Sequence, residues 1–271
     1  MRRCFHRARI ITTNNYAIVP KTLSLAGETS IFGVQDLEQL VEQSAKCAQD
    51  AVKEALAQGD IDARNAVRIA GCLPPLGASY KPEEVGTFDE MTAVYDRITA
   101  ALAPHVDVFL CETMSTGLEA KAAATSASKH GLPVWVAWTL EEEAKQDAAP
   151  LLRSGESIET AVGALDGIAV GALLFNCTSV GSITKGMAIL RKHAAEGVQV
   201  GGYANGFVTV KSDGSGSDYD KDLTPEVYAD TAKHWVDDGA ALIGGCCGVF
   251  PEHIAEISAR PWAAAAAQGS S

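Results

Sequence analysis

The chain has 271 residues, of which 47% are hydrophobic and 21% are charged, a balance typical of one soluble globular domain rather than of a disordered or fibrous protein. Its 22 basic and 34 acidic residues give a formal net charge of −12, which argues against a nucleic-acid-binding surface. No apolar run approaches the ~18 to 20 residues that cross a bilayer and no secretory signal is present, so we expect a cytoplasmic protein without membrane partners.

Short apolar runs alternate with longer stretches of helical spacing, which is the pattern of parallel strands joined by crossover helices. The run Val108-Phe109-Leu110 is apolar throughout, as expected for a strand that helices cover on both faces. We therefore predict an α/β fold, a (β/α)8 TIM-type barrel that lacks its first βα unit, with an open doubly wound sheet as the alternative. The predicted strands, in chain order, are 8–13, 66–72, 107–112, 133–140, 172–177, 199–204 and 241–246.

Three helices have recognisable ends. Asp36 is expected to cap the first, which Gly59 ends, and Thr224-Pro225 opens a second that Gly239 ends. Pro251 opens the last helix. The apolar face predicted for the first helix consists of Leu37, Leu40, Val41, Ala45, Ala48, Val52 and Leu56, and that of the second of Tyr228, Thr231, Ala232 and Trp235.

The remaining segments are less regular. Residues 211–222, rich in Gly, Ser and Asp, are interpreted as a mobile surface loop, and their place after a strand leaves room for a lid. We assign residues 1–260 to one barrel domain and 261–271 to a flexible tail. No phosphate-binding glycine loop follows a predicted strand.

Seven cysteines are present, an odd number in a chain too large to need disulfides for stability. We expect Cys47, Cys72 and Cys111 to be small buried apolar residues. Cys177 and the Cys246-Cys247 pair are different, because they come at the ends of predicted strands.

Ligands of α/β barrels bind beyond the carboxyl ends of the strands, so the polar residues that end the apolar runs are candidates for a site. Three thiols, one carboxylate and several amides would then share one rim. These strand ends are Thr13-Asn14, Glu112-Thr113, Asn176-Cys177, Asn205 and Cys246-Cys247.

Cys246 and Cys247 are neighbours, so both can bind one ion only where the backbone bends sharply, and the flanking glycines of Gly244-Gly245-Cys246-Cys247-Gly248 allow this. With Cys177 they would form a zinc site with three sulfur ligands and one open position, the catalytic pattern. The alternatives are buried free thiols and a strained vicinal disulfide. Such an electron-rich site suits activation of a substrate thiol better than activation of water.

Several motifs of this sequence resemble motifs of the homocysteine S-methyltransferase family and occur in the same order along the chain. They are Ile10-Ile11-Thr12-Thr13-Asn14-Asn15-Tyr16, Glu112-Thr113, Asn176-Cys177, and Leu242-Ile243-Gly244-Gly245-Cys246-Cys247-Gly248 followed by Pro251-Glu252-His253-Ile254. The resemblance covers about Ala8 to Ile257. It implies zinc on Cys177, Cys246 and Cys247, with Glu112 holding the ammonium group of homocysteine and Asn205 and Asn14 as further substrate-binding residues.

The chain departs from the family pattern in one respect. Family sequences begin with a strand that carries an acidic-glycine motif, whereas this sequence starts at what resembles the second strand. We expect two barrel strands with unpaired edges. Three explanations stay open: a start further upstream, an open barrel with weakened substrate binding, or a partner chain over the gap.

The sequence thus predicts a zinc-dependent methyltransferase that converts L-homocysteine to methionine with a sulfonium donor, S-methylmethionine or S-adenosylmethionine. A betaine-dependent enzyme is the next candidate for the donor. A non-catalytic zinc- or homocysteine-binding remnant, and a redox protein that uses Cys246 and Cys247, are the alternatives from other functional classes. A homo-oligomer is compatible with the sequence.

Overall fold

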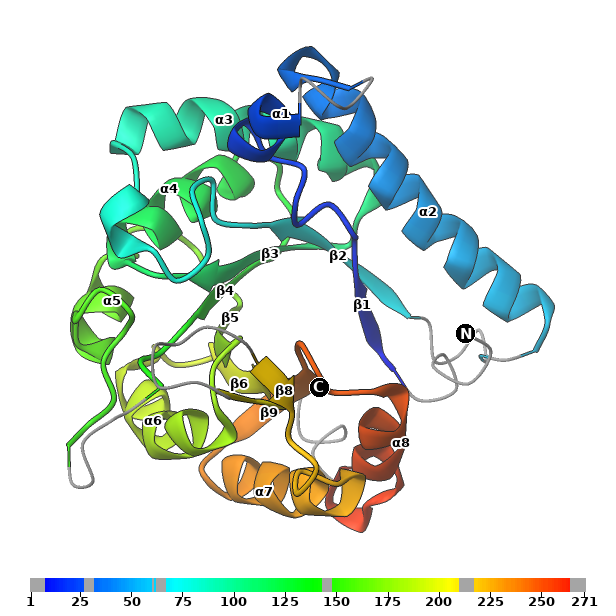
Figure 1. The fold of residues 1–271 in the computed structure, drawn as a ribbon, viewed down its shortest axis with the longest axis vertical. Coiled ribbons are helices and arrows are strands. Elements are labelled where there is room, and N and C mark those ends of the chain that lie inside the picture. The colour runs from blue at the N-terminus through cyan, green and yellow to red at the C-terminus, as the bar shows by residue number, and fades with distance from the viewer. Residues whose placement is uncertain are drawn as a thin grey trace.

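The computed structural model describes residues 8–26, 32–59, 61, 67–142, 148–209 and 217–263. Figure 1 shows a curled sheet with helices around its outside. The sheet is parallel, with seven strands in the described part of the chain. In order across the sheet they are β1 (Ile10–Thr12), β2 (Arg68–Leu73), β3 (Val108–Met114), β4 (Val134–Trp138), β5 (Ala172–Asn176), β6 (Gln199–Ala204) and β9 (Ala240–Gly245).

This strand order confirms the predicted barrel. Each strand of the sheet lies beside the one before it in the chain, whereas a doubly wound sheet reverses direction at a switch point. The open doubly wound alternative is therefore wrong. Within the described residues β1 and β9 form the two ends of the sheet, which confirms the expected unpaired edges.

The helices connect the strands in the expected way. The helix predicted from Thr224-Pro225 is confirmed, because the Thr224 side chain accepts a hydrogen bond from the Val227 N–H at its first turn. The bounds are α1 (Pro20–Ala26), α2 (Leu37–Ala57), α3 (Phe88–Leu102), α4 (Gly117–Ser128), α5 (Ile158–Gly163), α6 (Val180–His193), α7 (Pro225–Asp237) and α8 (Pro251–Ala259), with short 3-10 turns at Val34–Asp36, Pro82–Glu84 and Ala103–His105.

Three details of α2 differ from the prediction. Asp36 occupies the N-cap position, but its carboxylate does not cap α2. It accepts a hydrogen bond from the N–H of Gly33, three residues earlier in the chain. Leu56 is exposed, and the neighbouring Ala55 is buried in its place. Cys47 is also exposed, so its assignment to the core was wrong, while Cys72 and Cys111 are buried as expected.

The interpretation of residues 211–222 as a loop is wrong in part. Residues 210–216 lie outside the described residues, but β8 (Ser217–Tyr219) pairs antiparallel with β7 (Phe207–Thr209). Within the predicted tail, residues 261–271, Trp262 packs against the core, and residues 264–271 lie outside the described part. The domain boundary at residue 260 stays a prediction.

Side chains of successive strand residues point to opposite faces of the sheet, and both faces are buried in the central strands β3, β4 and β5. In β3, Val108 and Leu110 join a cluster inside the barrel with Trp135 and Leu174. Phe109 belongs instead to the larger core between the sheet and the helices. Because Glu112 continues the series of Val108 and Leu110, the alternation directs it toward the barrel interior at the carboxyl end of the strand.

A second buried acid, Glu119 in the first turn of α4, provides a test of the packing. Burial raises its pKa to about 7, although the Ser115 N–H donates to its carboxylate. The folded state therefore binds a proton more tightly than the unfolded state, so stability is lost as pH rises from about 4.5 to 7. We expect Glu119→Gln to raise the free energy of unfolding by about 2 kcal/mol at pH 8 and to change it little near pH 4.5.

Urea unfolding at the two pH values measures this difference. Glu90→Gln is a control with the opposite expected effect, a lower free energy of unfolding at pH 8. Hydrogen bonds from Thr87 lower the Glu90 pKa, and the charged form of Glu90 caps α3. If the Glu119→Gln protein is less stable than the original chain at pH 8, burial does not destabilise the charged form of Glu119 and the prediction is wrong.

Candidate metal and substrate site

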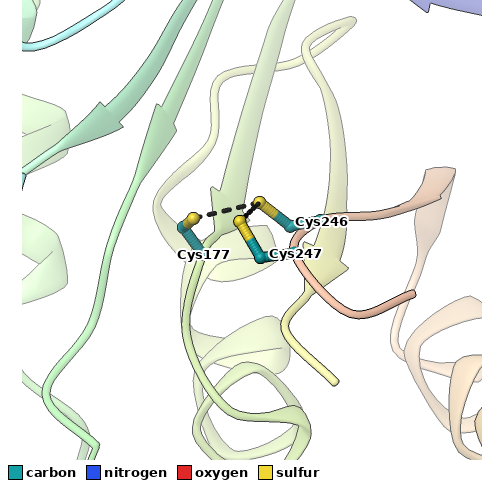
Figure 2. Close-up of side chains that lie close together, drawn as sticks. All are labelled: Cys177, Cys246 and Cys247. Atoms are coloured by element: carbon teal, nitrogen blue, oxygen red, sulfur yellow. Dashed lines mark hydrogen bonds between the residues drawn. The ribbon is translucent and has the colours of Figure 1, made fainter. Parts of the chain in front are cut away.

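Three cysteines from two distant parts of the chain meet at the carboxyl end of the sheet. Cys177 follows β5, and Cys246 and Cys247 follow β9. The Cys177 and Cys246 sulfurs are 3.0 Å apart, those of Cys246 and Cys247 are 3.9 Å apart, and all three lie within 4.8 Å of one another. Figure 2 shows the three side chains pointing toward one another. Cys177 is buried and Cys247 is exposed, so the cluster opens toward solvent on the Cys247 side.

The backbone is bent at both ends of this cluster. Cys177 has a φ of 53°, in the left-handed region that residues with a side chain rarely adopt. The loop after β9 lies tightly against the end of β6, where the Gly206 N–H donates to the Cys247 carbonyl at 2.8 Å. A Cβ at Gly206 would lie 2.5 Å from the Gly248 carbonyl oxygen, so the close approach requires glycine. The predicted sharp bend at the Cys-Cys pair is therefore supported by packing.

The three thiols do not ionise equally. Contacts with Cys177 and Cys246 lower the pKa of Cys247, so this thiol loses its proton first. The contact with Cys177, followed by that with Cys247 and by burial, raises the pKa of Cys246. The contact with Cys246 lowers the pKa of Cys177, but the contact with Cys247 and burial outweigh it. A nearby cation is therefore needed to make all three sulfurs thiolates at neutral pH.

The donor set suits zinc. A tetrahedral ion with Zn–S bonds of about 2.3 Å separates two sulfur ligands by about 3.8 Å. The separation of the Cys246 and Cys247 sulfurs, 3.9 Å, agrees with this value, and that of the Cys177 and Cys246 sulfurs, 3.0 Å, is shorter. No disulfide joins the cysteines in the described part of the chain. The cluster can therefore supply three sulfur ligands and leave a fourth position toward solvent.

Glu112 is a buried carboxylate beside this cluster. Its side chain accepts a hydrogen bond from the Tyr203 hydroxyl at 3.1 Å, and no basic side chain of the described residues forms an ion pair with it. Burial raises its pKa, the hydrogen bonds of Cys72 and Tyr203 lower it, and the charge of Cys247 adds to the rise. A buried carboxylate without a cation is an attractive partner for the ammonium group of a ligand.

Asn176 connects the carboxylate and the cysteines. Its side-chain oxygen accepts from the Thr113 N–H at 2.8 Å, and its Nδ2 donates to the Thr113 hydroxyl at 2.8 Å. Thr113 has a φ of 64°, again in the left-handed region. This pair of hydrogen bonds holds the ends of β3 and β5 in fixed positions relative to each other. The position of Glu112 relative to Cys177 is therefore fixed as well. The sequence showed Asn176 at a strand end, but nothing in it indicated this partner.

Comparison with known proteins identifies the family. Residues 6–260 match the family model described as homocysteine S-methyltransferase. The chain belongs to the homocysteine S-methyltransferase family. The homocysteine S-methyltransferase YbgG of Bacillus subtilis (strain 168) is 28% identical over 244 residues, which are 84% of this chain and 72% of that protein. A methionine synthase of Mycobacterium leprae (strain TN) is 30% identical over 162 residues, 56% of this chain and 12% of that protein.

A solved structure shares the fold of this chain. The metallated form of the homocysteine methyltransferase MmuM from Escherichia coli has the same fold, with a TM-score of 0.75 at 23% sequence identity. The match covers 96% of this chain and 83% of the MmuM chain. This homocysteine S-methyltransferase family member is thus an enzyme of the methyltransferase class, with an α/β barrel of the MmuM type. Its described helices include none that is long and apolar enough to span a membrane.

The two predicted amides lie in different environments in this methyltransferase. The Asn205 backbone N–H donates to the Thr178 carbonyl, and its side-chain Oδ1 is buried without a hydrogen-bond partner among the described residues. A buried oxygen of this kind is free to accept a hydrogen bond from a ligand. Asn14 is exposed in the loop after β1, whereas its neighbour Asn15 is buried and donates to the Cys72 carbonyl. The structure therefore does not bring Asn14 into the buried site.

The sequence patterns did not indicate that Tyr80 belongs to the candidate site. It lies between β2 and the Pro82–Glu84 turn, has a φ of 65°, and donates its hydroxyl hydrogen to the Cys177 sulfur at 3.1 Å. Its distance from Cys177 along the chain is 97 residues, so neither periodicity nor a local motif could have indicated the contact. Tyr80 is thus a further residue of the candidate site.

Proposed function

We propose that this chain transfers a methyl group from a sulfonium donor, S-methylmethionine or S-adenosylmethionine, to L-homocysteine and so forms methionine. The observation that carries the proposal is the meeting of Cys177, Cys246 and Cys247 within 4.8 Å. Zinc bound by these three sulfurs would hold the homocysteine sulfur as a thiolate at neutral pH, without a general base. We also propose a cytoplasmic location, where thiols stay reduced.

The side chains around the cluster would orient the amino acid. Glu112 would pair with the ammonium group, since its carboxylate is buried and has no ion-pair partner among the described residues. Asn205 would accept a second hydrogen bond at its unpaired Oδ1. Asn14, which is exposed, stays a prediction from the family resemblance alone.

The charge balance of the reaction favours a sulfonium donor. A thiolate and a sulfonium ion become two uncharged thioethers, so charge disappears as the methyl group moves, and a site with little water favours that change. Betaine, a quaternary ammonium donor, shares the positive charge and is the second candidate. The formal net charge of −12 is compatible with either cation.

Zinc analysis followed by methionine production from homocysteine tests the proposal. The purified chain is expected to hold one zinc per protein and to form methionine with a sulfonium donor, with activity lost to a chelator and recovered on adding zinc. Betaine is the comparison donor. Stoichiometric zinc without methionine from any donor would favour the non-catalytic remnant, and chelator-insensitive redox activity would favour a redox protein.

A further inference from the structure

The hydroxyl of Tyr80 is directed at one sulfur of the cysteine cluster. Within the described residues it is the one hydroxyl that hydrogen-bonds to a sulfur of Cys177, Cys246 or Cys247. The O···S distance is 3.1 Å, and the left-handed backbone at Tyr80 places the ring there. A residue with a side chain holds such a conformation only when its surroundings compensate for the strain.

Arg153 supplies much of that support. Its guanidinium lies over the Tyr80 ring, 4.7 Å from the ring centroid, and donates to Glu142 at 2.7 Å. Its Nε also approaches the Thr139 hydroxyl at 3.5 Å, and Thr139 donates to the Cys177 carbonyl. A cation over an aromatic ring draws electron density from it, which makes a phenolic O–H a stronger hydrogen-bond donor.

If the proposed function holds, the site must direct the methyl group to the homocysteine sulfur and not to one of its own cysteine sulfurs. Three cysteine thiolates would lie beside the homocysteine thiolate, and each is a nucleophile toward the methyl donor. If Cys177 attacked, an S–CH3 bond would form on Cys177 and the donor's C–S bond would break, its electron pair staying on the donor sulfur as a thioether. Cys177 would become S-methylcysteine, an uncharged and much weaker metal ligand, and the enzyme would be inactivated.

We propose that Tyr80 is a positioning residue that protects Cys177 from methylation. Its hydrogen bond occupies a lone pair of the Cys177 sulfur and lowers the nucleophilicity of that atom, so that the methyl group goes to homocysteine. Arg153 holds the ring in place and strengthens the donor. The nucleophilicity of a sulfur falls with its basicity, so a hydrogen bond that holds one lone pair of the Cys177 sulfur slows its alkylation severalfold.

Alkylation of the zinc-loaded protein by methyl iodide, without homocysteine, tests this proposal. After digestion, mass spectrometry measures the methylation of the Cys177 peptide relative to that of the Cys246-Cys247 peptide. Tyr80→Phe keeps the ring and removes the hydroxyl, and is expected to raise this ratio severalfold. Arg153→Met is expected to raise it by a smaller factor. Tyr219→Phe, whose ring stacks on Phe207 in the β7–β8 hairpin, is the control and should leave the ratio unchanged.

The zinc content of the same samples separates two kinds of failure. A zinc-loaded Tyr80→Phe protein with the ratio of the original chain would overturn the role of Tyr80 and leave the proposed function standing. An original chain that holds no zinc would contradict the proposed function, and this inference with it. During turnover, Tyr80→Phe should also inactivate faster than the original chain, with Cys177 as the methylated residue.

Discussion

Replacing Cys247 with alanine is expected to reduce zinc affinity by at least about 1000-fold and methionine formation to an undetectable level. Removal of one thiolate leaves two sulfur ligands, and the bonds to thiolates supply most of the large binding free energy of such sites. Cys247 is the most informative of the three cysteines because its side chain is exposed, so alanine should not disturb the core. Zinc content after dialysis and methionine formation measure the two effects.

Cys47→Ala is the matched control. Cys47 is also exposed but lies on α2, away from the cluster, and its removal should change neither zinc content nor activity. Circular dichroism and thermal unfolding of the metal-free proteins should show the same fold for both variants. Unchanged zinc content in folded Cys247→Ala would refute the three-sulfur site.

The fold could be predicted largely because its strands are apolar on both faces. Runs such as Val108 to Leu110 in β3 and Ala172 to Leu174 in β5 are buried throughout, so each stands out from the polar segments around it. Parallel strands in chain order then follow from the regular alternation with helices. The β7–β8 hairpin was missed since β8 lies in a segment of Gly, Ser and Asp, and its pairing partner, β7, is only three residues long.

The site was predictable where its residues end strands and not where they act through long-range hydrogen bonds. Cys177, Cys246 and Glu112 each come at the end of an apolar run, and the carboxyl ends of parallel strands share one rim. The role of Asn176 depends on Thr113, 63 residues away, and that of Tyr80 on a bent loop conformation. Such contacts are made by tertiary packing, which leaves no periodic signal in the sequence.

Both left-handed strand ends belong to the site. Thr113 follows Glu112 directly, and Cys177 follows Asn176, the residue that hydrogen-bonds to Thr113. Each bend interrupts the regular alternation of side chains, and at Cys177 it brings the sulfur to Cys246. The strain at these two positions is thus located at the candidate site.

Replacing Glu112 with glutamine is expected to raise the KM for homocysteine about 100-fold while zinc content stays the same. The variant keeps the size of the side chain and its ability to accept the Tyr203 hydrogen bond, but it removes the charge that would pair with the ammonium group. Loss of one partner of a buried charge pair costs about 2–5 kcal/mol, and 100-fold corresponds to about 2.7 kcal/mol. Steady-state kinetics with homocysteine as the varied substrate measures the effect.

The pH dependence distinguishes this role from a structural one. Because burial raises the pKa of Glu112, the carboxyl group of the original enzyme takes up a proton as pH falls, and its attraction for the ammonium group is then lost. The KM for homocysteine should therefore increase at low pH in the original enzyme, and Glu112→Gln should lack this component. Glu119→Gln removes the other buried carboxylate near the same end of β3 and should leave the KM unchanged. A Glu112→Gln enzyme with the original KM and a reduced kcat would assign Glu112 to another step.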